Sequence, residues 1–133
     1  MTQLHSGSCL CGAVQFTVSG PLGAVIYCHC SQCRKQTGHI FAGTNVPSEH
    51  LVVTGADHVV WYRSSPEARR GFCGTCGSVL FWKADNYPYT SILAGAFDGA
   101  TGLQAQRHDF VSGKGDYYQI TDGLPQNDRF PVR

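Results

Sequence analysis

The sequence lacks any run of about 18 consecutive apolar residues, so none of its segments is expected to cross a membrane as a helix. Charged residues are also few, at 14% of 133 residues, and 10 basic side chains nearly balance 9 acidic ones. This balance gives no electrostatic reason to expect a nucleic-acid partner or an anionic membrane partner. The same scarcity of charge leaves self-association into a homo-oligomer open.

A basic N-terminal segment followed by an apolar run is absent, so no secretory signal is expected. No internal repeat, low-complexity segment or linker divides the sequence either, and we expect one domain over residues 1–133. Without an export signal, we expect a reducing, cytoplasmic location, in which structural disulfides are disfavoured.

Short apolar segments rich in β-branched and aromatic residues predict a mostly β protein with little helix. Turn signals recur about every ten residues, which is typical of antiparallel sheets. Strands are expected at residues 13–18, 24–27, 40–42, 51–53, 59–63, 78–82 and 90–94. One or two helical turns are expected at 31–37, with Ser31 as the N-cap. The last third, rich in Gly, Asp and Gln, is expected to form loops and short strands.

The seven cysteines are an odd number, which cannot pair completely within one chain. They form three tight clusters: Cys9 and Cys11; Cys28, Cys30 and Cys33; Cys73 and Cys76. Neighbours separated by one or two residues suit a shared metal better than loop-closing disulfides. A structural zinc is closed by four protein ligands, whereas a catalytic zinc keeps three and an open position. Seven thiols therefore match one site of each kind.

The spacing of the cysteines favours particular groupings. Cys73 and Cys76 are separated by two residues, and the neighbouring glycines allow the chain to turn around an ion. Cys9 and Cys11 could supply two further ligands from one face of a strand, because residues i and i+2 of a strand project together. A metal that joins these distant segments would close a long loop and stabilise the fold substantially.

The other three cysteines lie within six residues, so one local segment could supply three ligands and leave a fourth position open. Cys28 and Cys30 are expected to project from the end of a strand, and Cys33 to return from the following turn. Two other interpretations are buried cysteines that only pack, and a redox dithiol at one Cys-x-x-Cys pair. The tight clustering favours metal binding over both.

Three motifs occur in a characteristic order: Gly-Ser-Cys-Leu-Cys-Gly-Ala-Val at 7–14, Cys-His-Cys-Ser-Gln-Cys-Arg-Lys at 28–35, and Phe-Cys-Gly-Thr-Cys-Gly-Ser at 72–78. From about residue 5 to residue 125, this pattern resembles the glutathione-dependent formaldehyde-activating enzyme family, which shares its domain with centromere protein V. Residues 119–126 also resemble the closing segment of the family.

The resemblance implies a mostly β, Mss4-like (β-tent) fold of small antiparallel sheets with two zinc sites and little helix. It implies a closed structural zinc site formed by Cys9, Cys11, Cys73 and Cys76. It implies an open catalytic zinc site formed by Cys28, Cys30 and Cys33. The implied activity is that of a carbon–sulfur lyase acting on a thiol–aldehyde adduct, with glutathione and formaldehyde or a related pair as substrates.

A three-thiolate zinc suits a soft sulfur ligand, so we expect a substrate thiol such as glutathione to bind there. Its carboxylates could pair with a basic side chain, and the candidates are Arg34, Lys35, Arg63, Arg69, Arg70 and Arg107. The first two rank highest because they directly follow the three-cysteine cluster. His39 and His108 are weaker candidates for proton transfer or ligation, and His29 is expected to face away and pack.

Two interpretations without this catalysis stay open at the level of sequence. The domain could be a non-catalytic zinc-binding scaffold that serves as an interaction module. It could also store metal or sense redox state through the three-cysteine cluster, which would make one zinc labile and those thiols easily oxidised.

Overall fold

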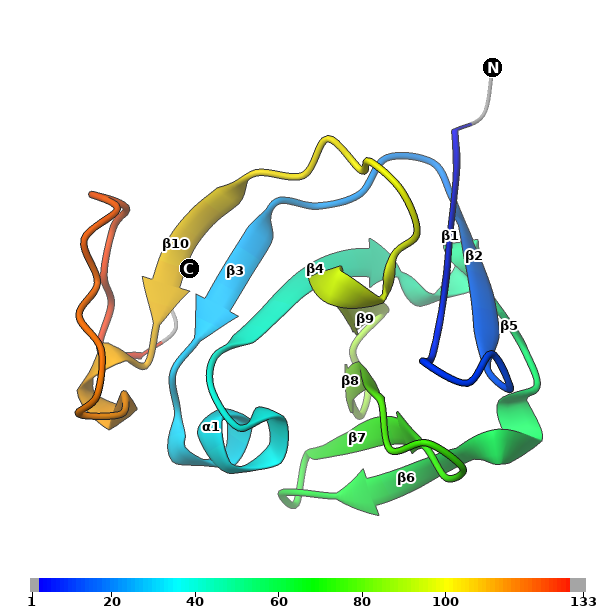
Figure 1. Ribbon diagram of the computed structural model, residues 1–133, viewed down its shortest axis with the longest axis horizontal. Helices are drawn as coiled ribbons and strands as arrows, with labels where there is room; N and C mark the ends of the chain where they lie inside the picture. The colour runs from blue at the N-terminus through cyan, green and yellow to red at the C-terminus, as the bar shows by residue number, and fades with distance from the viewer. Residues whose placement is uncertain (1–2, 130–133) are drawn as a thin grey trace.

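The computed structural model describes residues 3–129, in which ten strands form two sheets. The smaller sheet has the antiparallel order β1-β2-β5, with β1 (Leu4–Ser8), β2 (Gln15–Ser19) and β5 (Leu51–Thr54). The larger sheet has the order β10-β3-β4-β9-β8-β7-β6 (Figure 1). Its strands are β3 (Val25–Cys28), β4 (Phe41–Pro47), β6 (Val59–Arg63), β7 (Ala68–Cys73), β8 (Val79–Ala84), β9 (Tyr89–Leu93) and β10 (Ala105–Asp109).

Helical structure is limited to short segments. The α-helix, α1 (Ser31–Thr37), follows β3 and lies beside the ends of the larger sheet's strands (Figure 1). Single 3₁₀ turns occur at η1 (Ser48–His50), η2 (Ala56–His58), η3 (Ala94–Ala96) and η4 (Val111–Gly113). None of the helices within residues 3–129 is long and apolar enough to span a membrane.

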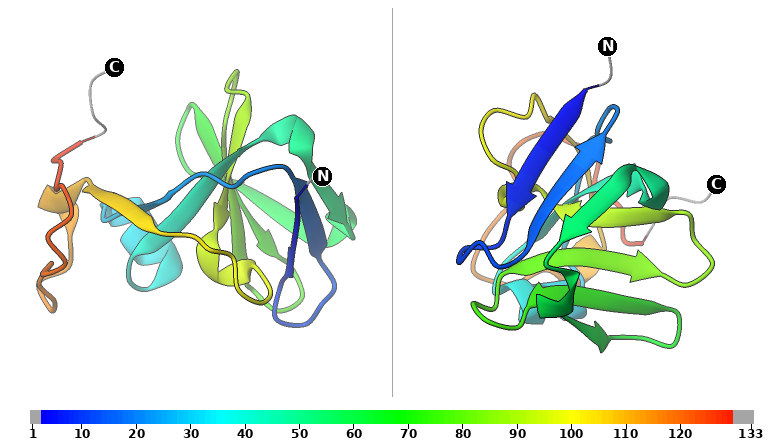
Figure 2. Two further views of the ribbon diagram at one scale, coloured as in Figure 1. Left: turned by 90° about the horizontal axis from the view of Figure 1, so that it is seen from above. Right: turned by 90° about the vertical axis from the view of Figure 1, so that its right-hand side faces the viewer.

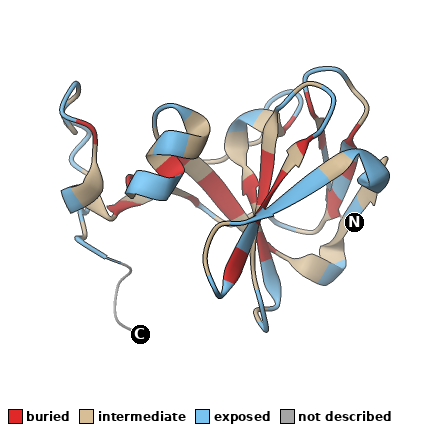
Figure 3. Ribbon diagram, turned by 90° about the horizontal axis from the view of Figure 1, so that it is seen from below, coloured by how far each residue is buried: buried red, intermediate tan, exposed pale blue. Residues whose placement is uncertain are grey.

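The hydrophobic core lies where the two sheets pack together. Phe16 of the smaller sheet makes edge-on ring contacts with Phe81 of the larger sheet and with Phe97, at centroid distances of 5.8 and 5.2 Å. Buried positions occur in strands of both sheets (Figure 3). Cys9 and Cys73 belong to this core, so the packing of the sheets brings one cysteine from the first cluster and one from the last together.

The mostly β, helix-poor fold expected from the sequence is confirmed. Strand β6 and helix α1 occupy the predicted ranges, whereas β4 continues to Pro47 beyond the predicted 40–42. Gly43 looks like a turn residue, but a Cβ there would lie 2.6 Å from the Phe41 ring, so glycine makes room for that ring within the strand. Strands β1 and β7 were not predicted because their glycine, serine and arginine residues conceal the alternating pattern.

One strand pair departs from the expected antiparallel arrangement, since β10 pairs with β3 in parallel. The chain reaches β10 from β9, in the middle of the sheet, through a long connection that passes β4 and β3. The segment after β10 lies on the outer side of β10, away from the smaller sheet (Figures 1 and 2). An isolated bridge between His108 and Gln126 ties this segment to the sheet.

Candidate metal centres and active site

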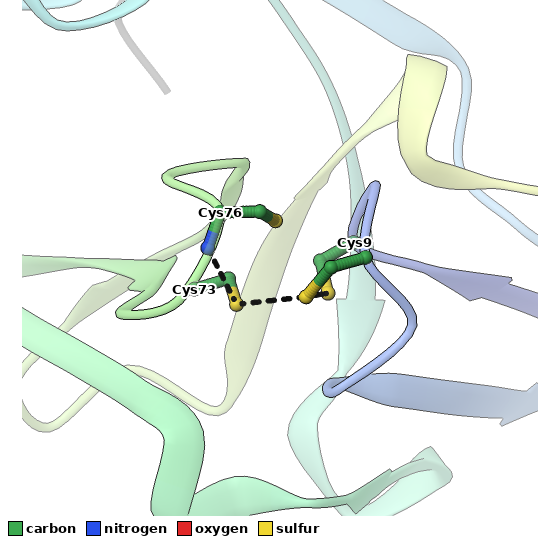
Figure 4. A group of neighbouring side chains, drawn as sticks. Cys9, Cys73 and Cys76 are labelled. Carbon is green, nitrogen blue, oxygen red and sulfur yellow. Dashed lines mark hydrogen bonds between the residues drawn. The ribbon is translucent and has the colours of Figure 1, made fainter.

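The first and last cysteine clusters come together into one four-sulfur group, hereafter the tetrad. Its sulfur atoms lie within 4.8 Å of one another, and its members are Cys9, Cys11, Cys73 and Cys76. Cys73 and Cys76 face Cys9 from a separate loop (Figure 4). The Cys9–Cys11 and Cys11–Cys73 sulfur distances are 3.6 and 3.9 Å. A tetrahedral zinc with Zn–S bonds of about 2.3 Å requires sulfurs about 3.8 Å apart, so this group fits zinc.

Cys9 and Cys11 lie in the turn after β1, so the expectation that they project from one face of a strand is wrong. The turn is closed by a hydrogen bond from the Gly12 N–H to the Cys9 carbonyl oxygen, at 3.2 Å. A turn directs both sulfurs to one point without the constraint of alternating strand faces. The Val14 N–H also donates to the Cys9 sulfur at 3.3 Å, which favours the thiolate form.

The other half of the tetrad is held by the loop between β7 and β8. The backbone N–H groups of Thr75 and Cys76 point at the Cys73 sulfur, at 3.4 and 3.5 Å. The Ser78 hydroxyl lies 3.3 Å from the Cys76 sulfur, and hydrogen bonds from the side chain and backbone of Ser78 lower the pKa of Cys76 to about 5. The loop therefore prepares its thiols for metal binding, which requires deprotonated sulfur.

The middle cluster forms a three-sulfur group, hereafter the triad: Cys28, Cys30 and Cys33. Cys28 is the last residue of β3, and Cys33 lies in the first turn of α1. Cys30, not the predicted Ser31, is the N-cap, and its sulfur accepts a hydrogen bond from the Cys33 N–H at 3.3 Å. Cys33 thus lies on a helix, where a simple turn was expected. The capping hydrogen bond fixes Cys30 and Cys33 relative to each other.

The three triad sulfurs interact directly. Hydrogen bonds from Cys28 and Cys33 lower the pKa of Cys30 to about 2, and the contacts with Cys30 and Cys33 raise the pKa of Cys28. This arrangement concentrates negative charge on one sulfur and leaves protons on its neighbours. A divalent cation placed among the three sulfurs would replace those protons.

The triad opens into a cavity of about 870 Å³ on one face of the larger sheet, whereas no tetrad cysteine lines this cavity. The remaining lining residues are Ile26, Ser31, Gln32, Phe41, Gly43, Asn45, Ser65, Glu67, Ala68, Arg70, Trp82, Ala84, Tyr87, Ser91, Arg107 and Phe110. This size lies in the range of small-molecule sites, and the lining combines aromatic, polar and charged groups, as such sites do.

Of the six basic candidates, Arg70 and Arg107 line the cavity. The other four do not line it: Arg34, Lys35, Arg63 and Arg69. Position next to the triad in the sequence was therefore a poor guide, because the part of α1 that lines the cavity ends at Cys33, before Arg34 and Lys35. Arg70 and Arg107 reach it from β7 and β10, as part of the sheet that forms its floor.

Arg70 is 3% exposed and donates hydrogen bonds to the triad. Its two terminal nitrogens each lie 3.5 Å from the Cys33 sulfur, and they also donate to Gln36 and Gln32, at 2.9 and 3.5 Å. None of its partners within residues 3–129 is a carboxylate. Because a buried cation needs a countercharge, the negative charge of the triad, which is concentrated on Cys30, balances Arg70.

The side of His29 that faces away from the triad carries a partly buried chain of hydrogen bonds that sequence reasoning missed. Asp122 accepts from His108 Nε2, His108 Nδ1 accepts from His29 Nε2, and His29 Nδ1 accepts from the Tyr118 hydroxyl, at 2.8, 2.8 and 2.5 Å. A carboxylate only accepts, so with both rings neutral Asp122 sets the direction of the whole chain. Burial and the neighbouring His108 lower the pKa of His29, which keeps its ring neutral.

His29 therefore faces away from the cavity and packs, as expected, while His108 serves this chain and neither ligates nor lines the cavity. His39 is exposed and hydrogen-bonds to the Tyr117 hydroxyl at 2.7 Å. No local signal in the sequence marked Tyr118 or Asp122, because both act across about 90 residues or through another side chain.

Comparison with known proteins agrees with this architecture. The profile of the family described as glutathione-dependent formaldehyde-activating enzyme matches residues 4–113. A Halomonas elongata protein that carries the same family name is 32% identical over an alignment of 131 residues, which covers 88% of this chain and 81% of that protein. A Schizosaccharomyces pombe protein named as an uncharacterised lyase is 29% identical over 123 residues, covering 89% of this chain and 86% of that protein.

Among solved structures, the crystal structure of a Rhodobacter sphaeroides protein is similar, with a TM-score of 0.61 and 27% identity. The similarity covers 71% of this chain and 89% of that one. Together with the two cysteine groups, it confirms the predicted mostly β, Mss4-like fold.

Proposed function

Because this chain belongs to the glutathione-dependent formaldehyde-activating enzyme family, we propose that it is a zinc-dependent enzyme that forms or cleaves the carbon–sulfur bond of a thiol–aldehyde adduct. The proposed substrates are a small thiol such as glutathione and formaldehyde or a related aldehyde. One observation carries this proposal: three thiols, one short of a tetrahedral ligand set, open into a cavity large enough for a small molecule.

The two cysteine groups have different proposed roles. The tetrad would hold a structural zinc with all four positions occupied, and the triad would hold a catalytic zinc with one position left for substrate. At the triad, zinc would supply the acidity that keeps a coordinated thiol deprotonated near neutral pH. The lyase name of the yeast relative supports the enzymatic role over that of a non-catalytic scaffold.

The residues around the triad would position the reactants and balance their charge. In the direction of synthesis, the thiol sulfur bonds to the carbonyl carbon, the C=O π bond breaks, and the oxygen gains the proton that the thiol has lost. Arg70 would offset the negative charge that three cysteine thiolates and a substrate thiolate bring together. Phe41 and Trp82 in the cavity wall would limit the access of water, so that the two reactants stay close.

Thiol binding tests this proposal directly. The protein loaded with Co²⁺ in place of zinc should change its sulfur-to-metal charge-transfer absorption when glutathione is added, and ¹³C-labelled formaldehyde should then exchange with its adduct faster than in buffer. The exchange is measured by NMR. A metal-loaded protein whose absorption responds to none of a panel of small thiols would contradict the proposal and favour a scaffold.

Arg70 gives a second test, because outer groups that hydrogen-bond to metal ligands typically contribute 10–100-fold in metal affinity. Arg70→Gln is expected to weaken metal binding at the triad by roughly this factor and to leave the tetrad unchanged. Arg70→Lys, which keeps the positive charge, should recover part of the loss. Affinities are measured by competition with a chelator, which separates a tight class of site from a weaker one.

The matched control is Arg69→Gln, since Arg69 is the exposed neighbour on β7 and stacks on Trp61 at 4.4 Å. If the triad binds metal with equal affinity in the Arg70→Gln and Arg69→Gln variants, the buried guanidinium does not stabilise metal at the triad.

Three sequence-based expectations stay predictions: one domain over residues 1–133, a cytoplasmic location, and the choice between monomer and homo-oligomer. The family match spans residues 4–113, so most of the predicted domain lies within it.

A further inference from the structure

Arg107 is a cavity residue whose orientation is fixed by a buried carboxylate. Its Nε donates to both carboxylate oxygens of Asp109, at 3.0 and 3.1 Å, and Asp109 is fully buried. Asn127 also donates to Asp109, at 3.2 Å. No hydrogen bond within residues 3–129 occupies the two terminal nitrogens of Arg107, which lines the cavity. The side chain is therefore held at its Nε and offers its terminal donors to the cavity.

A β-bulge brings Arg107 to the cavity side of the sheet. The register of β10 against β3 shifts between Ala105 and Arg107, so that Ala105 pairs with Val25 and Arg107 pairs with the next residue, Ile26. Ile26 lines the cavity, whereas Val25 is buried. Bulges of this kind redirect side chains and are common beside active sites.

The same register sets the spacing between Arg107 and the triad. Asp109 pairs with Cys28, so Arg107 lies two residues back on the neighbouring strand and on the same face. From strand geometry, the Cα atoms of Arg107 and Cys28 are about 8 Å apart. A molecule with its thiol at the triad and a carboxylate a few bonds away can span such a gap.

The charged groups of the cavity lining, apart from the triad thiols, are Glu67, Arg70 and Arg107. Arg70 is engaged by Cys33, and Glu67 is exposed. Arg107 is therefore the cation in the lining that has donors left for a ligand. Its planar pair of terminal nitrogens matches a carboxylate, which can accept two parallel hydrogen bonds.

We propose that Arg107 is a specificity-determining residue, which selects thiols that carry a carboxylate close to the sulfur. This inference rests on the proposed function of the triad and adds a residue to it. Asp109 acts as a positioning residue, because it holds the Arg107 fork toward the cavity without touching the ligand.

The test compares two probes that differ in one group, N-acetylcysteine and its neutral amide, N-acetylcysteine amide. Each is titrated into Co²⁺-loaded protein, and the ratio of their dissociation constants is measured in wild type and variants. Relative to an Arg107→Gln variant, wild type should favour the carboxylate probe by on the order of tenfold, as one charge-assisted hydrogen-bond pair predicts. Comparing ratios between proteins cancels the different acidities of the two thiols.

The matched control is Arg63→Gln, because Arg63 also pairs with an aspartate, Asp85, but lies outside the cavity on the exposed surface. It should keep the wild-type ratio. Arg107→Lys keeps a positive charge beside Asp109 but loses the planar fork, so it should bind both probes with a reduced preference. It also provides a folded variant if Arg107→Gln is unstable.

The outcomes separate selection by Arg107 from the proposed function. If both probes bind and the ratio is the same in wild type, Arg107→Lys and Arg107→Gln, selection by Arg107 is refuted while thiol binding at the triad stands. If neither probe binds wild type, the proposed function and selection by Arg107 both fail.

Discussion

The Cys73→Ser variant is expected to bind one metal ion fewer than wild type and to be largely unfolded at physiological temperature. Cys73 is fully buried in the core and contributes one of four sulfurs to the tetrad. The tetrad joins the turn after β1 to the loop after β7, and its Cys11–Cys73 contact spans 62 positions in the sequence. Without the ion, the chain must close that long loop with packing alone.

The free energy of unfolding is expected to fall by more than about 4 kcal/mol, as it does when a metal site or the packing of a core is disrupted. Structural zinc in small peptides contributes about 10–16 kcal/mol of apparent binding energy, and total protein stability is only about 5–15 kcal/mol. The serine hydroxyl is also smaller and more polar than the thiol that it would replace in the core. Elemental analysis gives the metal content, and circular dichroism during heating gives the stability.

Metal removal from wild type provides an independent comparison. Stripping both ions with a strong chelator should reproduce the instability of Cys73→Ser, because the effect arises from the lost ion. A Cys73→Ser protein with the wild-type melting temperature, or wild type that is unaffected by complete metal removal, would mean that the tetrad does not organise the fold.

The Cys30→Ser variant is expected to keep its fold and lose more than 100-fold in thiol-dependent activity, beyond the roughly 10–100-fold typical of changes to groups behind the ligands. Cys30 supplies one of only three sulfurs at the triad, so its loss leaves two protein ligands. Cys30 is also the N-cap of α1. Serine is a good N-cap, so the stability should change by less than about 1 kcal/mol.

A second substitution at the same position separates capping from metal binding. Cys30→Ala removes both the ligand and the cap, and is expected to be as inactive as Cys30→Ser but about 1 kcal/mol less stable. Activity is followed as adduct formation by NMR, and metal content is measured on the same samples. Retention of two zinc ions and of wild-type activity in Cys30→Ser would place the reaction elsewhere in the protein.

The partition of the cysteines could be predicted from the sequence because it depends on local spacing and on the resemblance to a family. The triad lies within six residues, and the tetrad is made from two closely spaced pairs, of which Cys73 and Cys76 were recognised as a turn. The structure brings together the same two groups. The backbone that presents them was less predictable, since a cysteine can cap a helix or occupy a turn as easily as it can end a strand, as Cys30 and Cys9 show.

The cavity residues could not be predicted from local pattern. Arg70 and Arg69 are neighbours of identical type. One is buried and the other is exposed because side chains alternate between the two faces of β7, a strand that was not predicted. Arg107 reaches the cavity because of a bulge that leaves no mark in the sequence. The partners of His29 come from a segment about 80–90 residues further along the chain. Such pairings follow from the sheet order, which is a property of the whole fold.

The separation of the two halves of the tetrad also bears on how the protein acquires its metal. During synthesis, the triad is complete once residue 33 has left the ribosome, whereas the four sulfurs of the tetrad cannot meet until residue 76 has followed. A nascent chain therefore offers an open three-sulfur site well before it offers the closed one. The closed site can capture its ion only when more than half of the polypeptide has been made and the two sheets have begun to pack.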